Sequence, residues 1–112
     1  MAYLLGIDIG TSGTKTLICD ETGTVLATAM GEHAEPVGDH PGWSEQDPRD
    51  WWRAACEATG AVLQKAGVRG DQITGIGLSG QMHGSVFLDD GQDPLRPAIL
   101  WNDQRTAAEC DQ

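Results

Sequence analysis

Apolar and polar residues follow one another along the chain in several short extended runs and one long helical stretch. Apolar runs at residues 3–9, 14–20 and 24–30 predict three strands. The segments between them are short, and short turns favour an antiparallel meander. Residues 31–46 are rich in glycine, proline, histidine and acidic side chains, and they predict a long loop.

A helix is predicted over residues 48–66. Asp47 is a typical capping residue, Pro48 suits the first helical position, and Gly67 is a typical terminator. We expect Trp51 and Trp52 to pack in the core and at the cap rather than to carry chemistry. Residues at helical spacing predict the buried stripe, which comprises Trp52, Ala55, Cys56, Thr59, Val62, Leu63 and Ala66.

The second half of the chain returns to extended runs. Residues 73–79 predict a strand that is reached from the third strand by a helical crossover. Residues 85–89 and 98–101 predict two further short strands, and a last helix is expected to begin near Asp103. This order predicts an α/β protein with a mixed sheet.

Composition narrows the class of protein. The chain has 112 residues, of which 39% are hydrophobic and 21% charged, so one folded domain is expected. A net charge of −10 argues against nucleic acid and against an anionic membrane surface, since both bind basic patches.

The sequence carries no clear signal for export, for a membrane span or for disulfide bonds. No signal peptide or membrane span is expected from the sequence. Three cysteines that are far apart predict neither a disulfide framework nor a zinc site, and they suit a reducing cytoplasm: Cys19, Cys56 and Cys110.

The first strand and its turn carry the strongest chemical signal. Asp8 lies inside an apolar run, where an ionised carboxylate costs several kcal/mol unless a metal ion, its water shell or donors compensate it. Residues 10–13 add backbone N–H groups and hydroxyls that suit a polyphosphate. This pattern predicts a nucleotide-phosphate site with Asp8 at the metal. A structural aspartate bonded to local N–H groups, next to an ordinary hairpin turn, is the alternative.

Two familiar motifs are matched only in part. A P-loop needs glycine directly before Lys-Ser/Thr, and here Thr14 precedes Lys15. Residues 75–80 fit G-x-G-x-x-G, but the glycines lie inside the predicted strand and no helix follows. We therefore expect neither a Walker site nor a dinucleotide site.

A second polar cluster follows the strand at residues 73–79. Ligands of α/β proteins gather beyond the carboxyl ends of strands, so this cluster and the Asp8 turn are expected to face one cleft. Gln81 and His83 offer hydrogen bonds, and flanking glycines allow a close backbone approach. A structural role for His83 is the alternative.

A third cluster lies at residues 99–105. Trp101 places an aromatic face beside an amide, an acid and a guanidinium, which suits a polyol or sugar. In the alternative interpretation, Asp103 caps the following helix, and Arg105 pairs with Asp103 or Glu109 on a solvated face.

Together these motifs resemble the FGGY family of carbohydrate kinases. Residues 6–15 are similar to the first phosphate motif of the family. Residues 41–48 followed by the tryptophan pair 51–52 are similar to its loop-and-helix signature, and residues 96–103 complete the pattern. Gly-Gln-Met-His-Gly at 80–84 is the most specific piece: it is similar to members that phosphorylate xylulose, whereas glycerol kinases carry Arg-Glu at the Met-His positions.

The resemblance implies a ribonuclease H-like or actin-like ATPase fold, with a mixed sheet whose first three strands are antiparallel. It also implies MgATP as co-substrate, with Asp8 as the catalytic and metal-holding residue, acting through the water shell of Mg²⁺. The implied phosphate-binding residues are Thr11, Ser12, Gly13 and Lys15. The implied sugar-binding residues are Gln81, Met82, His83, Trp101 and Asp103.

The implied reaction is phosphoryl transfer from ATP to the 5-hydroxyl of D-xylulose. Another sugar or polyol kinase of the family, such as a ribulokinase or glycerol kinase, and a non-catalytic ligand-binding fragment are the alternatives. The catalytic base, the adenine pocket and the second domain of the family lie beyond residue 112. Residues 1–112 are therefore expected to be the N-terminal part of the first kinase domain, cytoplasmic and inactive alone, with a homodimer expected of the full-length enzyme.

Overall fold

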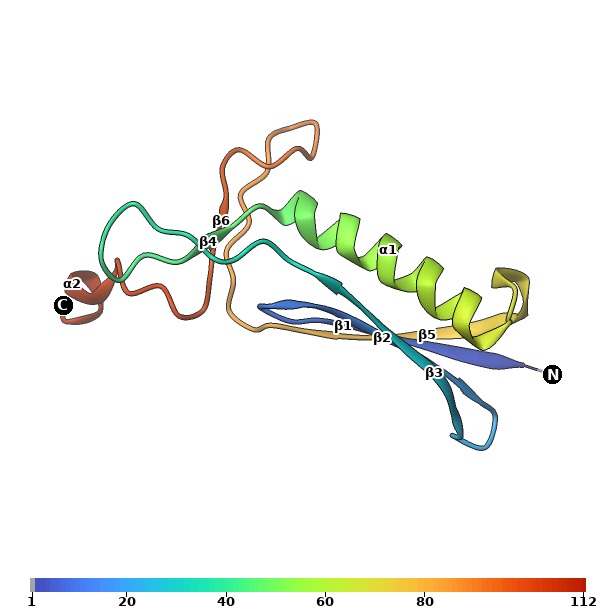
Figure 1. Ribbon diagram of the computed structural model, residues 1–112. Helices are drawn as coiled ribbons and strands as arrows, with labels where there is room; N and C mark the ends of the chain where they lie inside the picture. Colours follow the sequence, from blue (N-terminus) through green and yellow to red (C-terminus); the bar gives the residue numbers. More distant parts are fainter. Residues whose placement is uncertain (1) are drawn as a thin grey trace.

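A four-stranded mixed sheet with one long helix across it organises the molecule (Figure 1). The computed structural model describes residues 2–112. Strands β1 (Tyr3–Ile9), β2 (Gly13–Asp20) and β3 (Val25–Glu32) are antiparallel neighbours, and β5 (Ile73–Gly80) pairs in parallel with β1. The strand order is β3-β2-β1-β5. The predicted meander and the helical crossover are thereby confirmed.

Helix α1 (Pro48–Ala66) has the predicted bounds because local chemistry fixes both ends. The side chain of Asp47 accepts a hydrogen bond from the Arg49 N–H over 3.0 Å. Gly67 adopts φ 67°, a left-handed conformation that glycine enters without steric cost, and its N–H donates to the Gln64 carbonyl.

The predicted buried stripe of α1 is confirmed at Ala55 and Val62, which are buried, and at Leu63 and Ala66, which pack against the core, but it is wrong at Trp52 and Cys56. Trp52 is 74% exposed and Cys56 is exposed as well. The buried positions of the helix are Ala54, Ala55, Ala58 and Val62.

The close approach of α1 to the sheet explains which helix residues lie in the contact. A Cβ on Gly31 would lie 2.6 Å from the Ala54 carbonyl oxygen, so α1 and β3 meet with almost no side chain between them. The Thr16 hydroxyl, which is buried, donates to the Ala58 carbonyl over 2.9 Å. Only small residues fit this contact, and the bulky Trp52 is left outside.

The two faces of the sheet have different surroundings. Figure 1 shows α1 lying along one face, where Leu5, Ile18, Val62 and Val68 form the core. Among the residues described, no helix covers the opposite face. Large side chains there are accordingly exposed, as Met30 illustrates with 58%.

The segment between β3 and α1 and the segment after β5 extend beyond the carboxyl ends of β1 and β5 (Figure 1). A 3₁₀ turn, η1 (Gly70–Gln72), leads into β5, and a two-stranded ladder joins β4 (Glu45–Gln46) to β6 (Ala98–Ile99). The last helix, α2 (Ala107–Cys110), starts four residues after the predicted Asp103.

The predicted strand at 85–89 is wrong. Only isolated bridges occur there, from Ser85 to Ile99 and from Leu88 to Pro94. Every side chain of this stretch is exposed, so no burial stabilises a strand.

Within residues 2–112, no helix combines the length and the apolar composition that crossing a membrane requires. The described cysteines are all free thiols, as their spacing predicted.

Candidate functional site

Asp8 lies on the open face of the sheet, flanked by one residue from each neighbouring strand. Its register partners are Lys15 on β2 and Ser79 on β5. The Ser79 hydroxyl donates to Asp8 Oδ1 over 2.9 Å. Within residues 2–112 no backbone N–H donates to this carboxylate. The alternative of an aspartate held by local N–H groups is therefore not what the structure shows.

A depression of about 420 Å³ lies over these side chains. Asp8, Lys15 and Ser79 line it together with Gly6 and Gly77. The glycines add no side-chain bulk, so the carboxylate and the ammonium group can be reached from solvent. The depression thus offers a negative and a positive group to one ligand.

Residues 10–12 form the turn of the β1–β2 hairpin. The Gly10 N–H donates to the Gly13 carbonyl over 3.0 Å, which closes the turn. The N–H groups of Thr11 and Ser12 donate to no acceptor within residues 2–112, so both are available to an anionic ligand. The hairpin turn is confirmed, and phosphate binding by the same turn stays a prediction that this geometry allows.

Gly13 has a packing reason to be glycine. A Cβ at this position would lie 2.7 Å from the Gly31 carbonyl oxygen and 2.7 Å from Met30 Cε. The contact between β2 and β3 therefore excludes a side chain here.

A cavity of about 290 Å³ joins the turn to the segment after β5. The two strand ends meet because the Gln81 N–H donates to the Ile9 carbonyl over 2.8 Å. The lining brings together several of the predicted site residues: Asp8, Gly10, Thr11, Gly80, Gln81, Met82 and Trp101. The expectation of one cleft at the carboxyl ends of β1 and β5 is met by this geometry.

The Thr11 hydroxyl connects the two sides of this cavity. The Trp101 indole N–H donates to Thr11 Oγ1 over 3.1 Å, and Thr11 Oγ1 donates to Gln81 Oε1 over 3.1 Å. One hydroxyl therefore orients both the aromatic wall and the amide.

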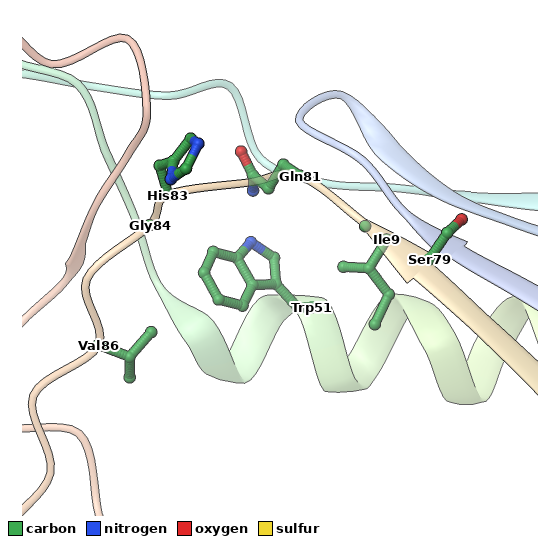
Figure 2. A pocket seen from close by; sticks show the side chains of 8 residues that line it. Ile9, Trp51, Ser79, Gln81, His83, Gly84 and Val86 are labelled. Atoms are coloured by element: carbon green, nitrogen blue, oxygen red, sulfur yellow. The ribbon is translucent and has the colours of Figure 1, made fainter.

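His83 faces a different cavity, which Figure 2 shows from close by. This space of about 320 Å³ is lined by His83, Trp51, Gly84 and Val86 among others. Met82 lines the cavity beside Asp8, whereas His83 does not. Met82 and His83, which were both expected to contact the sugar, therefore line different cavities. His83 has φ 56°, an uncommon conformation for a residue with a side chain.

Asp103 sits in an ion cluster and not on the cavity. Its side chain is 2% exposed and accepts from the Ser44 N–H over 2.6 Å and from Arg105 over 2.7 Å. Arg105 also pairs with Glu45 over 2.7 Å and stacks 3.8 Å above the Trp43 ring. Hydrogen bonding from Arg105 holds the pKa of the Asp103 carboxyl well below its usual range. In this conformation the carboxylate presents no free face to a sugar.

Of the two structural alternatives for this segment, the helix cap is wrong, whereas the pair between Arg105 and Asp103 is confirmed but is not on a solvated face. Thr106, and not Asp103, occupies the N-cap of α2. Arg105 pairs with Asp103 and Glu45, and its side chain is only 13% exposed, so the pair does not lie on a solvated face. These contacts join the 43–46 segment to the 101–105 segment, and we call this connection the strap.

Two site residues were missed by the sequence prediction. Gln46 and His33 are 5% and 8% exposed, and both approach the Thr11 carbonyl oxygen. Each lies in the stretch at 31–46 that was predicted as a loop. A histidine and an amide in a polar loop give no sequence signal of burial, so only their partners identify them.

The donor set suits MgATP. No group of three or more His, Cys, Asp or Glu side chains that could hold a metal ion lies within residues 2–112. Mg²⁺ keeps several of its waters and needs only one or two carboxylates in nucleotide sites, so a single exposed Asp8 is compatible with it. Lys15 and the free N–H groups of Thr11 and Ser12 suit phosphate oxygens.

An antiparallel meander, a crossover helix to a parallel strand and a phosphate-type turn at the strand ends define the class as the actin-like ATPase fold of sugar kinases. Solved structures agree. A xyloylose kinase from Brucella ovis superposes with a TM-score of 0.89 at 48% identity, over 97% of this chain and 23% of that chain. The fold predicted from the sequence is thus confirmed.

The family model described as the FGGY family of carbohydrate kinases, N-terminal domain, matches residues 3–112. The chain therefore belongs to the FGGY family of carbohydrate kinases. It is 46% identical over 106 residues to the xylulose kinase of Escherichia coli K12 and 42% identical over 110 residues to that of Bacillus subtilis 168. These matches cover 95% and 98% of this chain, which spans about one fifth of the length of either relative, 21% and 22%.

Proposed function

We propose that residues 1–112 are the N-terminal part of the first domain of a kinase that transfers a phosphoryl group from ATP to the 5-hydroxyl of D-xylulose. The observation that carries this proposal is the cavity in which Asp8 and Thr11 meet Gln81, Met82 and Trp101. The relatives named above are xylulose kinases, which supports this choice of sugar. A cytoplasmic location is part of this proposal, because three free cysteines suit a reducing compartment.

The phosphate side of the site is assigned to the β1–β2 turn. Thr11, Ser12 and Gly13 approach the phosphates, with N–H groups as the main donors, and Lys15 adds positive charge from β2. Asp8 would hold Mg²⁺ through the water shell of the ion. When bound, Mg²⁺ neutralises the charge that develops on the transferred phosphoryl group. The turn acts by positioning and charge stabilisation, as in-line transfer requires.

The sugar side is assigned to the segment after β5 and to the end of β6. Gln81 and Met82 line the cavity, and Trp101 forms its wall. His83 contacts the sugar from the adjoining cavity. Asp103, which the ion cluster encloses, supports sugar binding by fixing the segment that carries Trp101 and not by touching a hydroxyl.

The general base is not assigned to this chain. Asp8 is committed to the metal, and Asp103 is paired with Arg105. The base, the adenine pocket and the homodimer contacts are assigned to the further kinase polypeptide. The 112-residue chain alone is therefore expected to turn over no sugar.

A chimera tests the proposal directly. Residues 1–112 replace the matching N-terminal segment of the Escherichia coli xylulose kinase, and ADP production is measured with D-xylulose, ribulose or glycerol. We expect D-xylulose to give the highest kcat/KM for the chimera and no sugar-dependent ADP from the 112-residue chain. A folded chimera that prefers ribulose or glycerol assigns another sugar, and a folded chimera inactive with all three points to a non-catalytic binding fragment.

A further inference from the structure

Gln46 lies at the centre of a hydrogen-bond network between the two substrate sides. Its Nε2 donates to the Thr11 carbonyl over 2.7 Å and to the Ala34 carbonyl over 3.2 Å. Its Oε1 accepts from the Trp51 indole N–H over 3.0 Å and from Gln81 Nε2 over 3.2 Å. A primary amide has two N–H donors and two acceptor positions, and Gln46 uses all of them.

These contacts join elements that are separate in the sequence. Thr11 belongs to the β1–β2 turn, Gln81 follows β5, and Trp51 is in the first turn of α1. From the geometry we infer that Gln46 is a positioning residue for phosphoryl transfer: it holds the phosphate turn in register with the sugar-binding segment. This inference rests on the proposed function, because it concerns the same two substrates.

His33 is a second side chain that contacts the same carbonyl. Its Nδ1 lies 3.3 Å from the Thr11 carbonyl oxygen, and its Nε2 lies 2.8 Å from the Thr14 hydroxyl. Since a carbonyl only accepts, Nδ1 carries the proton, and in the neutral ring Nε2 accepts from the Thr14 hydroxyl. The Thr11 peptide is thus clamped by two buried side chains, His33 and Gln46.

The network requires an amide at position 46. The side that faces Thr11 and Ala34 must donate, and the side that faces Trp51 and Gln81 must accept. Gln46→Glu keeps the shape but turns a carboxylate oxygen toward two carbonyl oxygens, which repels the turn. Gln46→Leu removes all of the contacts and leaves buried polar partners unsatisfied.

A displaced turn changes where the phosphoryl group goes. In the aligned site the 5-hydroxyl attacks, the bond to ADP breaks, and the hydroxyl proton leaves to the general base. When the phosphate turn and the sugar are out of register, water attacks instead, and ADP, inorganic phosphate and a proton result. The ratio of ADP to sugar phosphate therefore reports alignment, whereas a purely structural defect lowers the amount of active enzyme without changing that ratio.

The test uses the chimera with D-xylulose and ATP both saturating, after circular dichroism has verified folding. For Gln46→Glu we expect kcat to fall by about 100-fold, the scale of a misplacement of about 1 Å. More than one ADP should form per xylulose phosphate. Gln64→Glu makes the same change on the exposed side of α1 and should leave both quantities unchanged. Gln46→Leu should resemble Gln46→Glu.

Two results would overturn the inference: an unchanged kcat in Gln46→Glu, or a reduced kcat with one ADP still formed per sugar phosphate. An inactive parent chimera would instead refute the proposed function. In that case, hydrogen exchange on the 112-residue chain tests whether Gln46 holds the phosphate turn in place. Faster exchange of the Gly10 N–H in Gln46→Glu, but not in Gln64→Glu, would support the clamp. Equal exchange in both variants would overturn it.

Discussion

Thr11 and Gln81, which are 70 residues apart in the chain, share a hydrogen bond of 3.1 Å from the threonine hydroxyl to Gln81 Oε1. The same hydroxyl accepts from the Trp101 indole N–H. A side chain of the phosphate turn therefore determines the orientation of two side chains assigned to the sugar.

Replacing this hydroxyl should weaken sugar binding although Thr11 belongs to the phosphate turn. Thr11→Val has a similar shape but neither donates nor accepts, so Gln81 and Trp101 lose their common partner. We expect the KM for D-xylulose in the chimera to rise by about tenfold, the equivalent of about 1.4 kcal/mol. Thr11→Ser keeps the hydroxyl and serves as the matched control. An unchanged KM in Thr11→Val would show that the bond does not orient the sugar side.

Asp8 gives a prediction for the metal. Asp8→Asn retains the size of the side chain and a partner for Ser79 but removes the negative charge. Turnover by the chimera should fall by about 100- to 1,000-fold, because charge stabilisation during transfer is lost. Raising the Mg²⁺ concentration should recover part of the activity.

The control for Asp8 is Asp71→Asn, which removes a charge in the exposed 3₁₀ turn η1. It should leave kcat unchanged. Near-normal turnover of Asp8→Asn would exclude a role for Asp8 at the metal.

His83 allows the two cavities to be tested separately. His83→Ala removes a ring from the cavity beside Trp51 and leaves the Asp8 cavity intact. We expect the KM for D-xylulose to rise by about tenfold and the KM for ATP to stay within about twofold. His40→Ala, in which the lost ring packs edge-on against Trp43, is the control and should change neither constant. Equal increases in both KM values would argue against a sugar contact.

The extent of the sequence prediction differs between elements for physical reasons. The bounds of α1 depend on Asp47, Pro48 and Gly67, which act through contacts within a few residues, and such local signals are visible in the sequence. The buried face of α1 depends on β3, because Gly31 brings the strand against Ala54. No pattern within the helix reports that contact, so Trp52 and Cys56 were wrongly placed on the buried face.

The same distinction holds for the site. Asp8 was found because a carboxylate in an apolar run is unusual, and Gln81 because it follows a strand beside glycines. Gln46 was missed because its role comes from Gln81, 35 residues away, and from Thr11. A polar side chain in a polar loop is conspicuous only after folding shows it to be buried.

The ion cluster makes a prediction about acid stability. The pKa of the Asp103 carboxyl is depressed in the folded chain, chiefly by hydrogen bonds from Arg105, so its ionised form stabilises the fold. This contribution is complete above the unfolded pKa of about 4 and is lost as the pH falls toward the lower folded value.

The variant Asp103→Asn lacks this contribution at every pH. In urea denaturation at pH 7 it should unfold with a free energy lower by about 1.5–3 kcal/mol than the parent, the range for hydrogen bonds to charged groups. The difference should shrink progressively below about pH 4, because protonation of Asp103 weakens the parent as well. Trp43 fluorescence follows the cluster, since its ring stacks on Arg105. Asp71→Asn should show no comparable pH-dependent difference, because that carboxylate is exposed. The difference in free energy of unfolding between Asp103→Asn and the parent could instead stay constant from pH 7 to pH 3. That result would mean that the Asp103 charge does not stabilise the fold and that packing holds the strap between the 43–46 and 101–105 segments.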